Sequence, residues 1–429
     1  MTISERTTYE RLENGVDLYL LPTKTHDVVV CNIALPGGSN AIYEKQTVAM
    51  LVSEILPGST KKQTRSTIRD QFDALGAQVS IQEGAERLFV RIRSRSAVFS
   101  DVFTLLVEVL TAPKFSASEV TEGKHRLHST LQQLKEDTNT QAGIARSQLL
   151  YKNGHPHWIQ TPEEASKELE TITPQEVQTY YRNTLSSVGG LVVIAGDISV
   201  KKIQTLLRTT LSQLPNKRPS AVPHVHLECT NTPTTRDVIV SLHDKINVDT
   251  LLAIPLSITR THEDYHALAA GVHVLGGGAS SRLFHTLRTK KSLTYGAYGS
   301  LGGLSDGYPG FLSAHAIFPH DVFMRARPEL RAVVETWAHA GISATELKKM
   351  KEEVTGKYKV GLSTTNGLAQ ALFTTILNGR DIAFIDTYPE LLQTLHLHAV
   401  NKAIHDHIDY SLSVTAAAGA VTQAGEPLV

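Results

Sequence analysis

The 429-residue sequence predicts an α+β fold of two homologous domains, each a mostly antiparallel sheet with helices packed on it. Three observations lead to this prediction. The chain is too long for one ordinary hydrophobic core. Strand-like runs are followed by runs of helices and do not alternate with them one by one, which is typical of α+β domains. Segments of the first half also return in the second half at a nearly constant separation, which indicates a duplicated unit.

Apolar runs occupy corresponding places in the two halves. Residues 28–35 and 250–256 are expected as buried strands. A helix-like pattern at 47–56 stops at Pro57-Gly58, and its counterpart at 265–275 stops at Gly276. The remaining strand patterns lie at 78–82, 88–93, 293–298 and 310–315.

The repeat can be measured at two places. The helix start Phe115-Ser-Ala-Ser-Glu-Val120 resembles Ile342-Ser-Ala-Thr-Glu-Leu347, and 342 − 115 = 227. The apolar run 191–196 parallels 414–419, and 419 − 196 = 223. The stretch between the halves is proline-rich and has no hydrophobic periodicity, as expected of a linker. We therefore expect a first domain at 1–213, a linker at 214–233 and a second domain at 234–429.

Composition excludes several classes of partner. The 42 basic residues balance the 42 acidic ones, so the chain has no charge excess that would attract nucleic acid or an anionic membrane. Its longest apolar stretches fall far short of the roughly 18 residues that a membrane span needs. The first nine residues have no apolar signal core, which predicts a cytoplasmic protein, or a periplasmic one if a signal peptide preceded this sequence. Cys31 and Cys229 lie far apart in the sequence and are expected as buried thiols.

The most informative motif follows the second of the two helix-like patterns. Three glycines, 276–278, end the apolar run, and Ser280 and Ser281 follow them. Arg288 and Tyr295 come next, seven residues apart. Glycines permit a tight turn and a close approach of two backbones. An arginine and a tyrosine supply a fixed cation and a phenolic donor, which can hold a peptide carbonyl or its oxyanion.

This run resembles the second half of the pitrilysin and insulin-degrading-enzyme family of inverted zinc peptidases. The resemblance covers essentially the whole chain and implies two domains that form half of a clamshell. It also implies that Arg288 and Tyr295 contact the substrate and act in catalysis, with Gly277, Gly278 and Ser280 beside the substrate. The plainer interpretations are a solvated cation at a helix end for Arg288, a half-buried strand residue for Tyr295 and a helix N-cap for Ser280.

The same resemblance shows where zinc ligands should stand. Inverted zincins carry H-x-x-E-H on a helix and a third ligand, a glutamate, on a later helix. In this chain Met50 and Glu54 occupy the two histidine positions, Ser53 occupies the position of the general base, and Leu131 occupies the position of the third ligand. These side chains cannot hold zinc or activate its water. We therefore expect a non-functional zinc motif and no metal or other cofactor in this chain.

A different zincin string, H-E-x-x-H, occurs as His262-Glu263-Asp264-Tyr265-His266. On a helix it would place both imidazoles on one face. However, Thr261 followed by Asp264 is typical of a capped helix start, which would put the string in the first exposed turn. We expect this structural role for the string, and a zinc site remains the alternative.

The resemblance implies a division of labour between two chains. This chain is expected to be the non-zinc, substrate-binding subunit of a heterodimeric zinc metallopeptidase that cleaves peptides. It would contribute Arg288 and Tyr295, while a homologous partner with H-x-x-E-H would supply the zinc. Three alternatives remain open: a non-catalytic structural subunit of a larger complex, like the core proteins of respiratory bc-type complexes; a homodimeric chamber that binds peptides; and an autonomous zinc peptidase that uses His262, Glu263 and His266.

Overall fold

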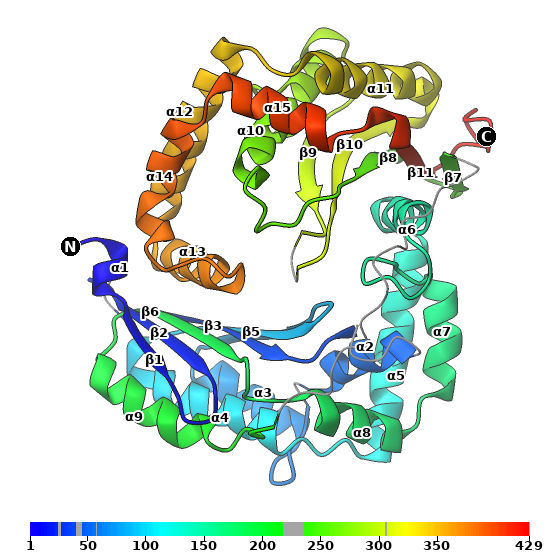
Figure 1. Cartoon of the computed structure of the whole chain (residues 1–429). Helices are drawn as coiled ribbons and strands as arrows, with labels where there is room; N and C mark the ends of the chain where they lie inside the picture. The colour runs from blue at the N-terminus through cyan, green and yellow to red at the C-terminus, as the bar shows by residue number, and fades with distance from the viewer. Residues whose placement is uncertain (25–26, 40–44, 57, 218–235, 305–306, 429) are drawn as a thin grey trace. The chain divides into compact units, whose positions relative to one another are not determined.

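The computed structural model describes all residues except 25–26, 40–44, 57, 218–235, 305–306 and 429. The chain forms two compact units, each organised around one β-sheet (Figure 1). The first unit contains residues 1–131, 163–224 and 358–388, and the second contains 132–162, 225–357 and 389–429. Among the described residues, no helix combines the length and the hydropathy needed to cross a bilayer.

The first sheet has six strands in the order β1-β2-β6-β3-β5-β4. Neighbouring strands are antiparallel except β2 and β6, which are parallel. The strands are β1 (Thr8–Arg11), β2 (Asp17–Pro22), β3 (Val29–Pro36), β4 (Gln78–Glu83), β5 (Arg87–Ser94) and β6 (Leu191–Gly196).

Within the described residues, the second sheet repeats this topology without a counterpart of β1. Its order is β7-β11-β8-β10-β9, and again only one neighbouring pair, β7 and β11, is parallel. The strands are β7 (Asp237–Ser241), β8 (Asn247–Pro255), β9 (Ala297–Gly302), β10 (Phe311–Pro319) and β11 (Val414–Gly419). The matching order and strand directions confirm the α+β fold class and the duplication that the sequence predicts.

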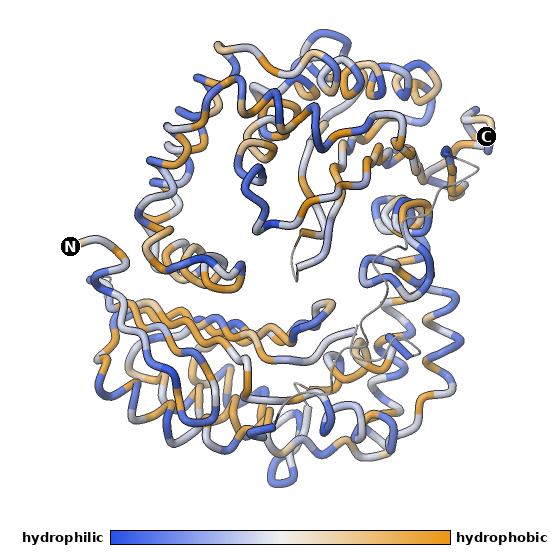
Figure 2. Tube along the Cα trace, in the orientation of Figure 1, coloured by the Kyte–Doolittle hydropathy of each residue, from blue (hydrophilic) through white to orange (hydrophobic). Residues whose placement is uncertain are grey.

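Burial follows the strand patterns. The first seven residues of β3 are all buried, because the sheet is covered on both faces at its centre, and β3 runs as a mainly orange tube in Figure 2. Toward the edge, β5 alternates between buried and more exposed residues, and β4 between exposed and half-buried ones. The central strands therefore supply the core, and the edge strand β4 presents one polar face.

Helices cover the sheets. Several begin at a capping side chain; Thr173 and Glu176, for example, form a capping box at the start of α8. The helices of the first half are α1 (Ile3–Arg6), α2 (Gln46–Ile55), α3 (Arg65–Ala74), η3 (Ser96–Val98), α4 (Phe99–Thr111), α5 (Ala117–Lys135), α6 (Thr138–Leu150), α7 (Pro162–Thr171), α8 (Pro174–Thr184) and α9 (Val200–Leu211). Those of the second half are α10 (Tyr265–Gly276), η4 (Phe284–Lys290), η5 (His320–Val322), α11 (Phe323–Ala340), α12 (Ala344–Gly361), α13 (Thr365–Leu377), α14 (Phe384–Thr394), α15 (Leu397–His407) and η6 (Tyr410–Leu412).

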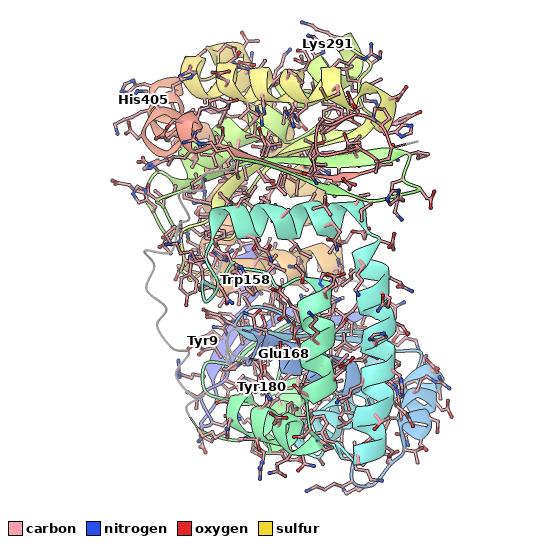
Figure 3. All side chains as sticks on the ribbon, turned by 90° about the vertical axis from the view of Figure 1, so that its right-hand side faces the viewer. Tyr9, Trp158, Glu168, Tyr180, Lys291 and His405 are labelled. Carbon is pink, nitrogen blue, oxygen red and sulfur yellow. The ribbon has the colours of Figure 1, made fainter. Side chains whose placement is uncertain are left out.

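Two equivalent helices, α6 and α13, are exchanged between the units. Each packs on the sheet whose strands come from the other half of the sequence. The helix α6 precedes the linker but packs on β11 and β8 of the second unit, with Ala145, Leu149 and Leu150 in one apolar cluster with Ala253 (Figure 3). The helix α13 lies in the second half but packs on β6 and β3 of the first unit. Both start at a threonine, and 365 − 138 = 227, the same separation as at the repeated helix start. Each unit therefore draws on both halves of the sequence.

Most of the expected linker, residues 218–233, lies outside the described residues, and so does Cys229. Cys31 is a fully buried free thiol in β3. Burial raises the pKa of this thiol far above its usual range, so it stays protonated and has a packing role.

Candidate functional site

The four positions of the zinc motif lie on two helices that pack closely together. Gly123 of α5 allows this approach, because a Cβ atom there would lie 2.5 Å from Cγ1 of Ile55 in α2. Glu54 forms an ion pair with Arg126 across the same two helices. Its carboxylate therefore serves as a structural partner at a position where the family has a metal ligand.

The other three positions carry side chains of different chemistry. Leu131 is buried with 1% of its surface exposed, and Met50 is half-buried. The hydroxyl of Ser53 is buried, and no residue that the structure describes forms a hydrogen bond with it. A thioether, a hydroxyl and an isobutyl group offer none of the imidazole and carboxylate ligands that zinc prefers. The residues present at this position of the fold therefore do not fit a zinc ion.

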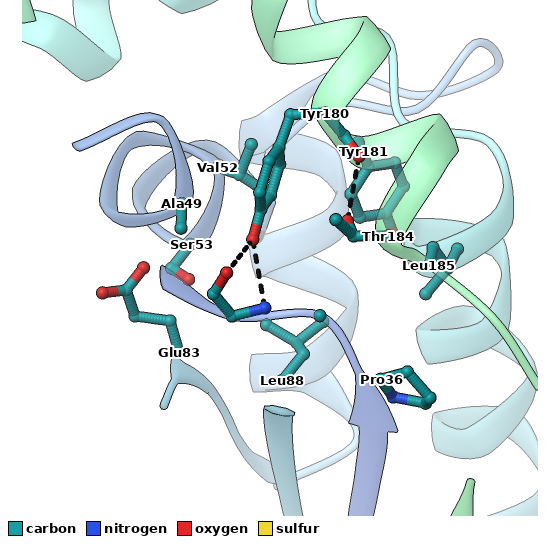
Figure 4. Close-up of a pocket in the computed structure, with 12 residues that line it drawn as sticks. Pro36, Ala49, Val52, Ser53, Glu83, Leu88, Tyr180, Tyr181, Thr184 and Leu185 are labelled. Carbon is teal, nitrogen blue, oxygen red and sulfur yellow. Dashed lines mark hydrogen bonds between the residues drawn. The ribbon is translucent and has the colours of Figure 1, made fainter. Parts of the chain in front are cut away.

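A small pocket of about 20 Å³ lies beside Ser53 (Figure 4). The hydroxyl of Tyr180 closes one side, where it donates to the carbonyl oxygen of Gly38 at 2.8 Å and accepts from the amide of Gly38 at 3.1 Å. The carboxyl group of Glu83 lies on the side of Ser53, and its Oε2 is buried with no partner in the described part of the chain. Burial raises the pKa of Glu83 to about 8, so this carboxyl group is mostly protonated at neutral pH.

The string at 262–266 does not form a zincin helix. The helix α10 begins only at Tyr265, so His262 and Glu263 precede it. His262 Nδ1 accepts a hydrogen bond from the amide of Asp264 at 3.1 Å, and Nε2 of His407 lies 3.0 Å from the Asp264 carboxylate. Within the described ranges, His262, Asp264 and His407 make the one group of three potential ligand atoms within 4.8 Å of one another. That group contains neither the glutamate nor the second histidine of the string.

The expected cap of this helix is wrong in one respect. Asp264 is the N-cap residue, and it makes no side-chain capping hydrogen bond. The Thr261 hydroxyl instead lies 3.0 Å from the hydroxyl of Thr259. Thr261 stands too far ahead of the first helical residue to accept from its backbone amides, because a capping side chain reaches only two or three residues onward.

The glycine run permits close packing, as predicted. A Cβ atom on Gly276 would lie 1.9 Å from the backbone nitrogen of Gly299 in β9, so α10 can end against this strand only with glycine here. A Cβ atom on Gly277 would meet the ring of His273, and one on Gly278 would meet the Glu353 carboxylate. The backbone of all three glycines is therefore constrained by the second unit itself.

The residues after the glycines are tied to α12. Ser280 donates a hydrogen bond to Glu353 Oε2 at 2.8 Å. Arg282 forms two hydrogen bonds with Glu346, at 2.7 and 2.8 Å, and Glu346 also completes the capping box of α12 by accepting from Ser343. These hydrogen bonds, above all the one from Arg282, lower the pKa of Glu346 to about 2. The Glu346 carboxylate that holds Arg282 is therefore charged at all ordinary pH values.

Arg288 stands on a π-helical segment, η4, a rare conformation that is frequent at functional sites. Its guanidinium lies 4.9 Å from the centre of the Phe284 ring and forms no ion pair with any described residue. The segment is fixed to the fold at its end, where Lys291 pairs with Glu329 of α11 (Figure 3). Arg288 is thus an exposed cation on a fixed support.

Tyr295 lies just before β9 and is 80% exposed. Its hydroxyl makes no hydrogen bond to any residue that the structure describes. A turn with Ser292 at a positive φ of 51° separates it from η4. Both predicted functional groups therefore belong to the same unit, point their polar ends to solvent and are available to a ligand.

Sequence reasoning missed a polar group on the first sheet. Asn32 lies in the middle of β3, and Arg91, Glu83 and Gln370 line the same pocket of about 340 Å³. The one signal in the sequence was the asparagine itself, inside an apolar run that otherwise predicts a buried strand.

Comparisons with known proteins agree with this description. Residues 171–354, which include Arg288 and Tyr295, match the family described as "Peptidase M16 inactive domain". The chain is 20% identical over 376 residues to the "Non-peptidase homolog YmxG" of Helicobacter pylori, covering 87% of this chain and 84% of that protein. It is also 20% identical over 397 residues to the "Uncharacterized zinc protease YmxG" of Bacillus subtilis, covering 91% of each.

A solved structure has the same fold. The crystal structure of a peptidase M16 inactive domain from Pseudomonas fluorescens superimposes with a TM-score of 0.85 at 19% identity, over 96% of this chain and 97% of that one. The resemblance to inverted zinc peptidases that the sequence indicates is thereby confirmed. Residues 171–354 thus match the M16 inactive domain, and most of the chain is similar to proteins named as homologues of this peptidase family.

Proposed function

We propose that this chain is the non-zinc, substrate-binding subunit of a two-chain peptidase. A homologous partner that carries H-x-x-E-H would supply the zinc, the attacking water and the general base. The single observation that carries the proposal is the contrast between the two units. The first has side chains unsuited to zinc at all four positions of the motif, whereas the second holds an exposed arginine and an exposed tyrosine with no partner among the described residues.

In this proposal Tyr295 donates a hydrogen bond to the scissile carbonyl oxygen as negative charge develops on it. Its hydroxyl is free to do so because no described residue binds it. Arg288 holds the neighbouring backbone carbonyl of the peptide and adds positive potential. Neither group would need to break an existing hydrogen bond or ion pair first, which keeps the cost of reorganisation small.

The strand β9 offers a place for the peptide. It begins two residues after Tyr295 and is an edge strand of the second sheet. On its outer side, no other described strand pairs with its backbone. An extended peptide can add to such an edge through main-chain hydrogen bonds. Its scissile bond would then pass close to the tyrosine that precedes the strand.

A second function is supported by one specific finding. The Helicobacter pylori relative is named a non-peptidase homologue, which favours a non-catalytic structural subunit. The exposed Arg288 and Tyr295 weigh against this alternative, because a purely structural role does not require the pair that the resemblance places beside the substrate.

The test is reconstitution. Hydrolysis of an unstructured peptide such as casein fragments is measured with this chain alone, with an H-x-x-E-H homologue from the same genome alone, and with both. We expect turnover in the mixture only. A tight complex of the two chains without turnover would support the structural subunit and contradict our proposal, and turnover by this chain alone would contradict both.

A further inference from the structure

The pocket of about 340 Å³ in the first unit lies between the face of the sheet that α13 covers and α13 itself. Strands β3, β5 and β4 form its floor, with Asn32, Arg91 and Ser80 in one row across the three strands. Phe89 and Phe373 provide apolar walls, with ring centres 6.3 Å apart. Its volume lies within the range of pockets that hold small ligands or side chains.

Asn32 is the unusual residue of this pocket. It occupies a central strand and is only 3% exposed, between Val30 and Ala34, which pack against α13. Its Oδ1 accepts a hydrogen bond from Nε of Arg91 at 3.2 Å, but its Nδ2 is buried without a partner among the described residues. A buried amide group that lacks a hydrogen bond costs folding free energy, so its presence calls for an explanation.

The neighbouring groups create a site for an anion. The guanidinium of Arg91 is held from two sides, by Asn32 and by Oε1 of Gln370 in α13 at 2.6 Å. Ser80 and Gln82 of β4 add polar groups on this face, whereas the carboxyl group of Glu83 lies on the opposite face, beside Ser53 (Figure 4). Arg91 is then the one charged side chain that the described lining residues turn into the pocket. An amide N–H and a guanidinium are both donors, and both suit a carboxylate ligand.

The second unit shows that the fold does not require these groups. In the register of the first sheet, Asn32 of β3 stands opposite Arg91 and Val193. Leu251 of β8 has the same place in the second sheet, where it stands opposite His315 and Ala416. The helices α6 and α13 are 227 residues apart, so Gly143 of α6 is equivalent to Gln370 of α13. A Cβ atom on Gly143 would have no described atom outside its own helix within 4 Å, so this position has room for a side chain. The same scaffold thus folds with leucine and glycine where the first unit has its polar groups.

We propose that this pocket is a second peptide-binding site, which takes a carboxylate group of the peptide between Asn32 and Arg91. The peptide would reach it along β4, the edge strand, whose residues Gln78, Ser80 and Gln82 face the same side as the pocket. The inference rests on the proposed function only in taking a peptide as the ligand. It makes acidic or free-carboxylate peptides the preferred substrate class.

Binding to this chain alone tests the inference, with no partner and no turnover. Three fluorescein-labelled octapeptides share one sequence: one has a central aspartate and an amidated C-terminus, one has asparagine and an amidated C-terminus, and one has asparagine and a free C-terminus. Fluorescence anisotropy at pH 7 should show at least tenfold tighter binding of one or both carboxylate peptides than of the uncharged one. Which of the two binds tightly identifies the source of the carboxylate. Equal binding of all three would overturn the proposal.

Two matched variants separate this pocket from general charge attraction. Arg91→Gln and Arg93→Gln each remove one positive charge from the same face of β5. The two residues are two positions apart in the strand, but only Arg91 lines the pocket. The preference should fall at least tenfold in Arg91→Gln and remain in Arg93→Gln. An equal loss in both variants would show surface attraction only and would refute the site.

Asn32→Leu gives the first unit the leucine that the second unit has at the equivalent position, Leu251. It should abolish the preference and leave the thermal midpoint unchanged or higher, because it removes the unpaired buried amide. Retained preference in Asn32→Leu would contradict the proposal. These binding results do not depend on hydrolysis, so a failed reconstitution with the zinc-bearing partner leaves them interpretable.

Discussion

Tyr295→Phe is expected to lower turnover of the assembled two-chain peptidase by about 100- to 1,000-fold, as removal of one oxyanion donor does in other peptidases. This corresponds to roughly 3 kcal/mol in the activation barrier. The hydroxyl forms no hydrogen bond with any described residue, and 80% of the residue is exposed. Its removal should therefore leave the stability of this chain and the assembly of the complex unchanged.

The measurement is kcat and KM of the reconstituted complex, together with its dissociation constant. The loss should appear in kcat, because the donor acts on charge that develops in the transition state. Tyr9→Phe is a suitable control, since Tyr9 is also an exposed tyrosine but lies on β1 of the first unit. Unchanged turnover in Tyr295→Phe would remove this residue from the mechanism.

Glu83→Gln is expected to stabilise the chain increasingly as the pH rises. Burial raises the pKa of Glu83 from 4.5 to about 8. The folded state therefore holds a proton that the unfolded state releases between these two pH values, and the free energy of unfolding falls as the pH rises through this window. At one pKa unit per 1.36 kcal/mol, the penalty reaches about 3 kcal/mol at pH 7 and levels off at about 4 to 5 kcal/mol above pH 8.

Glutamine keeps the shape of the protonated side chain and removes this penalty. Urea unfolding of the wild type and the variant at pH 5, 7 and 8.5 should give a difference in unfolding free energy that is small at pH 5 and grows with pH. Taking the difference at each pH cancels the contribution of the other titrating groups. A difference that does not change with pH would show that Glu83 titrates normally in the folded chain.

Much of the fold followed from local patterns in the sequence. The apolar run at 28–35 and the helix patterns at 47–56 and 265–275 correspond within one or two residues to β3, α2 and α10. Hydrophobic periodicity determines such elements locally, and Pro57 and Gly276 mark where the two helices end. The repeat at 227 and 223 residues was predictable for the same reason, since equivalent elements keep equivalent patterns.

The exchange of α6 and α13 could not be predicted in this way. An apolar helix face shows that a helix is buried against something, but not which of two similar sheets it meets. The two helices occupy equivalent positions, and each packs on a sheet whose central strands come from the other half. Only the three-dimensional contacts distinguish this arrangement from two helices that each remain on their own sheet.

The candidate site was predictable in its residue types but not in its geometry. The sequence placed Arg288 and Tyr295 near a glycine run. The π-helical turn under Arg288 and the lack of a described polar partner for either side chain depend on the tertiary structure. The pocket around Asn32 was missed because its members come from β3, β5 and α13, which are far apart in the sequence. Their only common signal is a polar residue within an apolar strand.

The zinc content of the isolated chain tests the central claim most directly, because that claim assigns the metal to the partner. The purified chain is incubated with a slight excess of zinc, and unbound metal is then removed by buffer exchange. The ratio of zinc to protein is measured by elemental mass spectrometry. We predict far less than one zinc per chain, and no change in His266→Ala. One zinc per chain that is lost in His266→Ala would contradict the account.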